Sequence, residues 1–290
     1  MIPLRIAVIG AGNIAQRYHL PSLTRLAEGA DAPIRCAALC DLDADRAREM
    51  AARYGFERAF SDYRAMLDAI APDAVWVLTP FTTTREVAGY TLDRGAATFM
   101  EKPPGANSRE TRELLEIAQR RGTPHQVAFN RRYAPLLQRA KALAAGAGPM
   151  QALSCQFYRV RRDEDYFAFG TGLHGLDALR YLADSEVAEV QARPGPRGSA
   201  LITLACENGA LVVMEMLPQV GIQSERYTLH AADRTVMVEG VIGWLTLFPG
   251  FLECYDQGRL ALRIDNAADP QPAEIVSGFY GESAAFIASL

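Results

Sequence analysis

Residues 5–15 read RIAVIGAGNIA, and this stretch decides the fold of the first part of the chain. Its first five residues form a mostly apolar, partly β-branched run, which is typical of a buried parallel strand. The run ends in the turn GAGNIA at residues 10–15, a G-x-G-x-x-A pattern that opens a helix. In such a turn the first glycine allows the tight bend, the second admits a pyrophosphate, and the helix N-terminus offers free N–H groups. The pattern predicts a dinucleotide site with contacts from Gly10, Gly12, Asn13 and Ile14.

Strands and helices alternate along the first 128 residues. The runs that read as strands lie at residues 5–9, 34–40, 59–60, 74–78, 97–100 and 125–129. Helical patterns lie between them at residues 18–23, 44–54, 62–69, 86–94 and 108–121, the last with Ser108 as its expected cap. Alternation at this spacing predicts an α/β domain with a doubly wound parallel sheet over residues 1–128.

The second strand ends at Asp41, where an acidic residue holds the ribose diol in a dinucleotide fold. The sequence DLDAD at residues 41–45 could also start the next helix by capping it. The two roles are compatible, because Asp43 can be the cap while Asp41 contacts the ribose. A carboxylate at Asp41 would repel a 2′-phosphate, so we expect NAD rather than NADP as the cofactor.

After Asn130 strand-like segments follow one another, which predicts an α+β domain with a mostly antiparallel sheet over residues 129–290. The expected strands lie at residues 152–160, 187–192, 200–206, 210–216, 226–231, 235–239, 244–248, 251–255 and 260–264, with one long helix at 173–182. The dipeptide Asn208-Gly209 is a hairpin signal between two of them. Residues 211–214 are apolar on both faces, so we expect a second copy of the chain to cover the sheet, as a homodimer or homotetramer.

Composition excludes several classes of protein. An apolar fraction of 49%, a charged fraction of 22% and a net charge of −4 are those of an ordinary globular protein with no basic run for nucleic acid. Residues 1–3 lead directly into the first strand, which leaves no room for a signal peptide, and no apolar run could span a bilayer. The five cysteines are scattered without metal-ligand spacing. We therefore expect a cytoplasmic protein with reduced thiols and no metal site or membrane contact.

Seven motifs carry a family resemblance: VIGAGNIA, HLPSL, CDLDADRA, LTP at 78–80, EKPPG, FNRRYAP at 129–135 and GLHGLDALRYL at 172–182. With them the chain resembles the glucose–fructose oxidoreductase / inositol dehydrogenase / rhizopine catabolism (Gfo/Idh/MocA) family over nearly its whole length. The EKP motif, which follows the TP strand end along the chain, is the most specific part. The resemblance implies a Rossmann domain, an open-faced substrate domain, and hydride transfer between NAD(H) and a carbinol or ketone of a sugar, sugar derivative or cyclitol.

The resemblance also implies roles for individual residues. It places Lys102 beside the reacting hydroxyl and His174 as the acid/base, and it implies a cis peptide before Pro103. Lysine is a compact donor that can hold an alcohol oxygen, and histidine titrates near neutrality as a proton shuttle must. The implied cofactor contacts include Thr79, Pro80, Glu101 and Lys102. The implied substrate contacts are Lys102, Tyr158, His174 and Asp177.

The chain departs from the family pattern in three places. Gly170 stands where the family often has an aspartate, and Phe81 and Thr84 replace an asparagine and a histidine after the TP dipeptide. The chain also stops within a helical pattern at 281–290, so we expect a shortened variant. These departures leave two alternatives to a CH–OH dehydrogenase: a non-catalytic NAD- and sugar-binding protein, or an enzyme that recycles bound NAD during glycoside cleavage or epimerisation. If His174 is only structural, Tyr158 and Tyr166 are the next acid/base candidates.

Several other polar residues allow more than one interpretation. Asp177 lies one helical turn after His174 and could orient it, touch substrate, or be solvated. The arginines at 159, 161 and 162 would suit an anionic ligand, but a solvated charge run is the interpretation we favour. No pairing argues for function at His19, His125 or His230.

Overall fold

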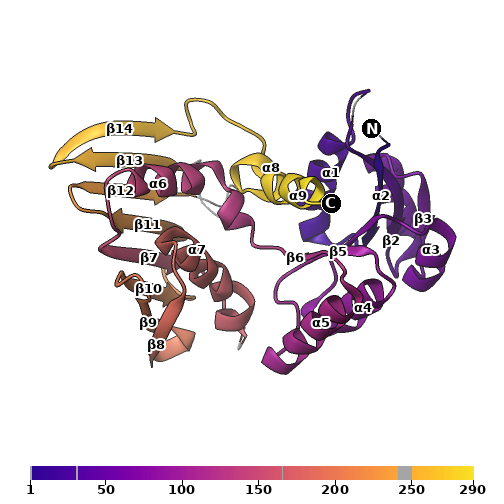
Figure 1. The fold of residues 1–290 in the computed structure, drawn as a ribbon, viewed down its shortest axis with the longest axis horizontal. Coiled ribbons are helices and arrows are strands. Elements are labelled where there is room, and N and C mark those ends of the chain that lie inside the picture. Colours follow the sequence, from indigo (N-terminus) through magenta and orange to yellow (C-terminus); the bar gives the residue numbers. More distant parts are fainter. Residues whose placement is uncertain (1, 31, 165, 241–249) are drawn as a thin grey trace. The chain divides into compact units, whose positions relative to one another are not determined.

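A computed structural model describes residues 2–30, 32–164, 166–240 and 250–290 of the chain. The chain divides into two compact units, and each is described by itself (Figure 1). The first comprises Met1–Ala128 together with Phe279–Leu290, and the second is Phe129–Gly278. The sequence-based boundaries placed residues 279–290 in the second domain, whereas the structure groups them with the first. The strand predicted at residues 244–248 lies outside the described residues.

The first unit contains a parallel sheet of six strands in the order β3-β2-β1-β4-β5-β6. Its strands are β1 Leu4–Ile9, β2 Ile34–Cys40, β3 Arg58–Phe60, β4 Ala74–Val77, β5 Ala97–Met100 and β6 His125–Val127. Strands β2 and β3 follow β1 on one side of the sheet, and β5 and β6 follow β4 on the other. The predicted doubly wound sheet is therefore confirmed, and the neighbouring strands β1 and β4 form its topological switch point.

Helices cover both faces of this sheet. They are η1 Ala15–His19, α1 Leu20–Leu26, α2 Ala44–Tyr54, α3 Tyr63–Ile70, α4 Phe81–Asp93, α5 Ser108–Arg121 and α9 Phe279–Ala288. Asp43 caps α2 as predicted, by accepting from the backbone N–H groups of Asp45 and Arg46. The cap of α5 is Asn107 rather than Ser108, because the Asn107 side chain accepts from the N–H of Glu110 at 3.0 Å. Among the described residues no helix is long and apolar enough to cross a membrane.

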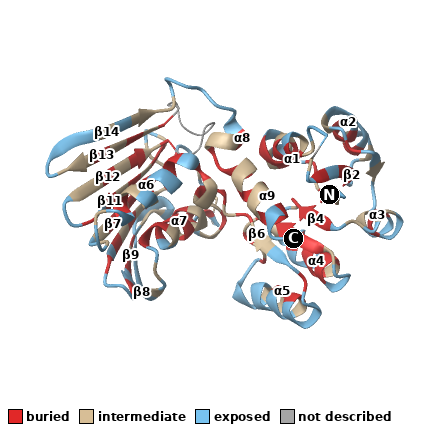
Figure 2. Ribbon diagram, turned by 45° about the horizontal axis from the view of Figure 1, so that its top comes forward, coloured by how far each residue is buried: buried red, intermediate tan, exposed pale blue. Residues whose placement is uncertain are grey.

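The two faces of the sheet belong to two cores, since side chains alternate along each strand. Figure 2 shows the buried residues of these strands and of the helices that cover them. On one face Trp76 is fully buried and stacks on Phe99 with ring centroids 5.2 Å apart. Helix α9 packs on the same face, where Phe286 meets the edge of Trp76 at 5.6 Å. Burial of Phe286 and Ile287 in this core explains why the end of the chain belongs to the first unit.

The second unit is built on an eight-stranded sheet in the order β14-β13-β12-β11-β7-β10-β9-β8. Strands β7 and β10 pair in parallel, and the other neighbours are antiparallel. The strands are β7 Ala152–Tyr158, β8 Val187–Pro194, β9 Ala200–Cys206, β10 Leu211–Leu217, β11 Ser224–His230, β12 Arg234–Glu239, β13 Phe251–Asp256 and β14 Arg259–Asp265. The predicted mostly antiparallel α+β architecture is confirmed.

The sequence predicted one long helix in this unit, and the structure contains a second. The helical segments are η2 Asn130–Tyr133, α6 Pro135–Ala145, η3 Ala168–Gly172, α7 Leu173–Ala183, η4 Pro196–Gly198 and α8 Ala273–Val276. Helix α6 begins with a proline at its first position, which is a start signal that sequence reasoning overlooked. Its buried residues are Leu136, Leu137, Ala140 and Ala144, at helical spacing.

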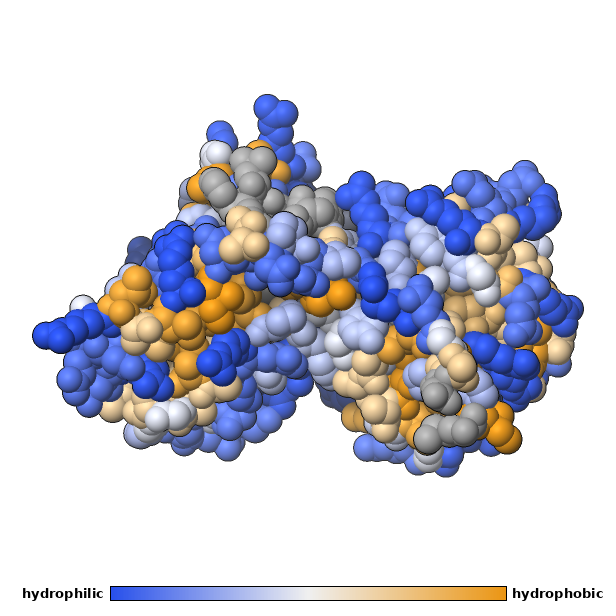
Figure 3. All heavy atoms as spheres, turned by 90° about the horizontal axis from the view of Figure 1, so that it is seen from above, coloured by the Kyte–Doolittle hydropathy of each residue, from blue (hydrophilic) through white to orange (hydrophobic). Residues whose placement is uncertain are grey.

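Helices α6 and α7 cover one face of the second sheet. Phe157 and the alternate residues of β7 point into this core. Helix α7 lies unusually close, because a Cβ on Gly175 would be 2.6 Å from the Met214 side chain and 2.9 Å from Phe157. The opposite face carries both charged pairs and exposed apolar side chains, including Leu211, which is 67% exposed. Figure 3 shows that apolar side chains reach the surface of both units.

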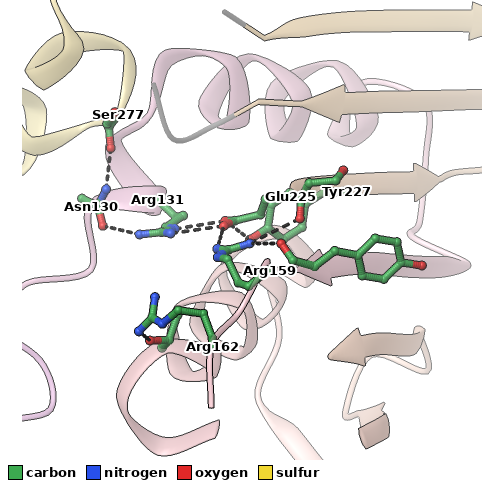
Figure 4. Close-up of polar contacts among 10 residues, drawn as sticks. Asn130, Arg131, Arg159, Arg162, Glu225, Tyr227 and Ser277 are labelled. Carbon is green, nitrogen blue, oxygen red and sulfur yellow. Dashed lines mark hydrogen bonds and ion pairs between the residues drawn. The ribbon is translucent and has the colours of Figure 1, made fainter. Parts of the chain in front are cut away.

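A buried ionic cluster ties together the segments at which the chain enters and leaves the second unit (Figure 4). Glu225 on β11 is fully buried and accepts from Arg131, Arg159 and the Tyr227 hydroxyl. Arg131 also donates to the Asn130 side chain, which in turn donates to the backbone oxygen of Ser277 at 2.6 Å. The residue after Ser277 is Gly278, whose φ is +85. A Cβ on Gly278 would lie 2.1 Å from the backbone oxygen of Asn130. The cluster and this glycine hold residues 130 and 277 side by side.

Charge balance within the cluster keeps Glu225 ionised. Burial raises the pKa of Glu225, but Arg131 and Arg159 outweigh that effect and bring the pKa to about 2, from an ordinary value of 4.5. The folded-state pKa is thus lower than the unfolded-state pKa. Ionised Glu225 stabilises the fold above about pH 4.5, and that stabilisation is lost as the pH falls toward 2.

We expect Glu225→Gln to lower the free energy of unfolding by about 3–5 kcal/mol at pH 7, since it leaves two arginines buried without a counter-charge. Calorimetric unfolding would measure the loss. The control is Glu186→Gln, the same change in an exposed pair with Arg180, which should alter stability little. The difference in the free energy of unfolding between Glu225→Gln and the unchanged protein should decrease as the pH falls from 5 to 2. A constant difference across that range would contradict this account.

Candidate active site

The glycine turn after β1 has the geometry that a dinucleotide needs. Gly10 has φ +100, and a Cβ there would lie 2.5 Å from the Leu78 carbonyl oxygen. Only glycine fits at this close approach of the backbone after β1 to the backbone after β4. A Cβ on Gly12 would meet nothing within 4 Å, so the backbone is open on that side. This exposed glycine and the helix that opens at Asn13 fit a bound pyrophosphate.

Asp41, at the end of β2, lies directly against the same turn. Its Oδ2 accepts from the backbone N–H of Ala11 at 2.8 Å, and its Oδ1 accepts from Asp43 N and from Arg46. Burial raises the pKa of Asp41, but the hydrogen bonds from Arg46, Ala11 and Asp43 outweigh it and lower the pKa below its usual value. Asp41 is therefore a fixed carboxylate beside the glycine turn, as a ribose-binding residue must be.

The Thr79-Pro80 dipeptide follows β4 and leads at once into α4, with Pro80 as the residue before the helix. Thr84, at the position of the family's histidine, is fully buried one turn into α4. Its hydroxyl lies 3.1 Å from the backbone oxygens of both Thr79 and Pro80. In this chain Thr84 thus stabilises the backbone at the end of β4.

The EKP motif follows β5. Glu101 is 8% exposed, and its Oε2 accepts from the backbone N–H of Lys102 at 3.1 Å. Burial raises the pKa of Glu101, but His19 and Lys102 lower it by more, so that the net pKa lies below the usual value. The Lys102–Pro103 peptide is cis, which confirms that expectation.

His19 is a residue whose pairing sequence reasoning missed. Its Nε2 lies 2.8 Å from Glu101 Oε1, and the imidazole is fully buried. The expectation that His19 has no informative pairing is wrong, because η1 turns it inward toward the end of β5. The available signal was its place in HLPSL, on the helix that follows the glycine turn.

A second signal in the sequence was also overlooked. The chain has 30 basic residues, and only Lys102 and Lys141 among them are lysines. Arginine serves at every other basic position, and the lysine within EKP supplies a compact, titratable amine there. The structure brings the ends of β1, β2, β4 and β5 to one carboxyl edge of the sheet, and the predicted cofactor residues all lie on these ends.

His174 lies in the second unit, in the first turn of α7. It is partly buried, with its ring edge-on to Phe129 at 6.5 Å between centroids. Asp177, one turn later, is bound by Arg132 of the FNRRYAP motif, whose Nε donates at 2.8 Å. This ion pair was not among the roles expected for Asp177, and because the carboxylate is buried and paired, the solvated interpretation is wrong.

Comparisons with known proteins identify the family of this chain. Residues 4–129 match the model of an oxidoreductase family with an NAD-binding Rossmann fold. Inositol 2-dehydrogenase 2 of Saccharopolyspora erythraea is 30% identical over 85% of this chain and 74% of its own length. The chain belongs to the Gfo/Idh/MocA oxidoreductase family.

Solved structures of other proteins share the fold. A dehydrogenase from Chromobacterium violaceum superposes with a TM-score of 0.85 at 19% identity, covering 100% of this chain and 88% of its own. Levoglucosan dehydrogenase, solved with NADH and L-sorbose, has a TM-score of 0.81 at 18% identity, with coverages of 100% and 90%. At this identity the likeness concerns the fold alone.

At Gly170, where this Gfo/Idh/MocA chain differs from the family pattern, the Tyr166 ring lies against the glycine. A Cβ on Gly170 would lie 2.8 Å from the ring of Tyr166, so the tyrosine occupies the space of a side chain at that position. The backbones of the two residues are also joined, because the Gly170 N–H donates to the backbone oxygen of Tyr166 at 2.6 Å. An aspartate here would have to displace the Tyr166 ring.

Tyr158 is not brought together with His174. Side chains alternate along β7, so Phe157 faces α7 and Tyr158 points to the opposite face of the sheet. There its hydroxyl donates to Glu215 on β10. Burial, together with this carboxylate, raises the pKa of Tyr158 to about 12, which does not suit an acid/base near neutrality.

The arginine run is also different from a solvated charge run. Arg159 is 1% exposed and belongs to the Glu225 cluster, so that interpretation is wrong for this residue. Arg162 donates to Glu164 and to the Thr171 hydroxyl, which ties the loop after β7 to η3. These pairings commit Arg159 and Arg162 to contacts within the second unit, while Arg161 is exposed.

We expect Gly10→Ala and Gly12→Ala to fail in different ways. Gly10→Ala should destabilise the first unit, because its Cβ would overlap the Leu78 carbonyl at an unfavourable φ. Gly12→Ala should melt near the unchanged protein yet bind NAD more weakly, because its Cβ would occupy the side open to a pyrophosphate. Thermal unfolding and calorimetric titration would separate the two. If Gly12→Ala binds NAD as tightly as the unchanged protein, the pyrophosphate lies elsewhere.

Proposed function

We propose that this chain is an NAD-dependent dehydrogenase or reductase that acts on a CH–OH or ketone carbon of a sugar, sugar derivative or cyclitol. The observation that carries the proposal is Lys102, retained as lysine in EKP at the carboxyl edge that also holds the glycine turn and Asp41. The name of a relative, inositol 2-dehydrogenase 2, supports the class of substrate.

Bound NAD would supply the hydride acceptor, with Gly10, Gly12, Asn13 and Ile14 around its pyrophosphate and Asp41 at a ribose. In the oxidation direction Lys102 hydrogen-bonds the substrate oxygen and offsets its growing negative charge. His174, neutral, takes the hydroxyl proton. Thr79, Pro80 and Glu101 line the cofactor side in this proposal, and Asp177 lies near the substrate.

A panel of polyols and sugars with NAD, followed by NADH absorbance, tests the function. The second candidate, a non-catalytic NAD- and sugar-binding protein, is favoured by Gly170, where the Tyr166 ring takes the place of a carboxylate. Turnover with any polyol supports the dehydrogenase. Binding of NAD and a sugar without turnover in either direction across the panel supports the second candidate.

Loss of either proposed catalytic side chain should slow turnover. We expect His174→Ala to reduce kcat by about 10²–10⁴-fold, the usual contribution of general acid–base catalysis. Lys102→Ala should cost at least as much, because it removes both positioning and charge. Lys141→Ala is the matched control, since the other lysine pairs with exposed Asp184. Steady-state kinetics on a proven substrate measures all three, and full activity in His174→Ala would make His174 structural.

We propose that NAD binds more tightly than NADP, because the fixed carboxylate of Asp41 accepts from ribose hydroxyls and repels a 2′-phosphate. Calorimetric titration with both cofactors should show this preference. Asp41→Ala should reduce the difference in affinity between NAD and NADP, chiefly because NADP would no longer be repelled by the carboxylate. A clear preference of the unchanged protein for NADP would contradict the proposal.

We also propose a homodimer or homotetramer built on the open face of the second sheet, where Leu211 and Leu201 are exposed on neighbouring strands. Light scattering at micromolar concentration should give a multiple of the 31.7 kDa chain. Leu211→Glu should shift the mass toward one chain, whereas Leu115→Glu on α5 should not. A single 31.7 kDa species in the unchanged protein would refute the assembly.

A further inference from the structure

We infer that His19 is a positioning residue, which holds the Glu101 carboxylate against the backbone of Lys102 and thereby fixes the direction of the Lys102 side chain. The inference rests on the proposed function of Lys102. It concerns residues of the first unit only, and it assigns a use to the buried imidazole that the proposed mechanism leaves unused.

One carboxylate joins the two residues. His19 Nε2 lies 2.8 Å from Glu101 Oε1, while Glu101 Oε2 accepts from the Lys102 backbone N–H at 3.1 Å. An ionised carboxylate only accepts hydrogen bonds, so His19 carries its proton on Nε2 and donates. With one oxygen bound on each side, the carboxylate cannot rotate without breaking one of the two bonds.

Aromatic side chains hold the imidazole in place. The His19 ring is edge-on to Phe99 at 5.6 Å and to Phe279 at 5.0 Å, and Phe279 also stacks on Tyr18 at 4.3 Å. Phe99 lies on β5 two residues before Glu101, whereas Phe279 begins α9. Residues 15–19 form a π-helical turn at the end of the glycine turn, a rare conformation that is frequent at functional sites. The support beneath EKP thus comes from three separate parts of the first unit.

Loss of the imidazole would reach Lys102 through Glu101. Glu101 is buried and ionised, so without His19 its Oε1 would lose a charge-assisted hydrogen bond in a place of low polarity. The carboxylate would then turn or take up a proton. Either change releases the Lys102 backbone N–H, and displacement of a catalytic group by about 1 Å can cost about 10²-fold in rate.

The small number of lysines permits a direct test that needs no substrate. Reductive methylation with ¹³C-formaldehyde preserves the lysine charge and gives NMR signals from Lys102, Lys141 and the terminal amine. Lys102→Arg and Lys141→Arg each remove one signal and thereby assign both lysines. In His19→Ala we expect the Lys102 signal to shift and broaden while the Lys141 signal stays in place. His19→Gln should restore it, since the amide Nε2 can donate in place of the ring Nε2.

Two further variants make the test specific. Glu101→Gln keeps the size of the side chain and removes its charge, so it should shift the Lys102 signal even if His19→Ala does not fold. The double variant His19→Ala/Glu101→Gln should give nearly the same Lys102 signal as Glu101→Gln alone, because His19 acts through Glu101. His125→Ala, an exposed histidine of the same unit, is the control and should leave the signal unchanged.

On a proven substrate, unmethylated His19→Ala should lower kcat about tenfold to a hundredfold, change KM for NAD far less, and recover in His19→Gln. An unmoved Lys102 signal in folded His19→Ala or in Glu101→Gln would overturn the inference, as would failure of His19→Gln to restore it. Absence of turnover across the polyol panel would instead refute the proposed function, and the NMR result would stand apart from it.

Discussion

The contact between Gly10 and the Leu78 carbonyl is the constraint on which the first unit depends. At residue 10 the backbone passes so close to the end of β4 that a Cβ would lie 2.5 Å from that oxygen. This approach seats β1 and β4 as neighbours at the switch point. Asp41 then fixes the turn from the other side through Ala11 N. The positions of the expected cofactor contacts follow from these few backbone atoms.

Each unit also contains a buried carboxylate whose partners decide its state. Glu225 is balanced by two arginines and holds the entry and exit of the second unit together. Glu101 has a histidine and a backbone N–H, so its surroundings are less strongly charged. Burial of an unpaired carboxylate would cost several kcal/mol. The chain therefore uses the same physical device for two purposes: a rigid scaffold in one unit and, in our proposal, an oriented lysine in the other.

Much of this could be predicted from sequence, because the deciding signals are local. Apolar runs of strand length, the glycine turn and Asp41 predicted the parallel sheet and its functional edge. What was missed depends on contacts between distant segments. The membership of α9 in the first unit and the pairing of His19 with Glu101 join residues at least 82 positions apart. The HLPSL motif could draw attention to His19, but no local pattern names its partner. Tyr158 was difficult to place for a local reason. Side chains alternate along β7, so a shift of one residue decides which face of the sheet Tyr158 lies on.

The central claim is that the ends of β1, β2, β4 and β5 form the NAD site with Lys102 beside the nicotinamide. A crystal structure of the protein with NAD bound tests it most directly. The account predicts the pyrophosphate over Gly10–Ala15, a ribose at Asp41, and the Lys102 amine within hydrogen-bonding reach of a substrate oxygen next to nicotinamide C4. A nicotinamide bound away from the end of β5, or a Lys102 side chain directed away from the ring, would contradict it.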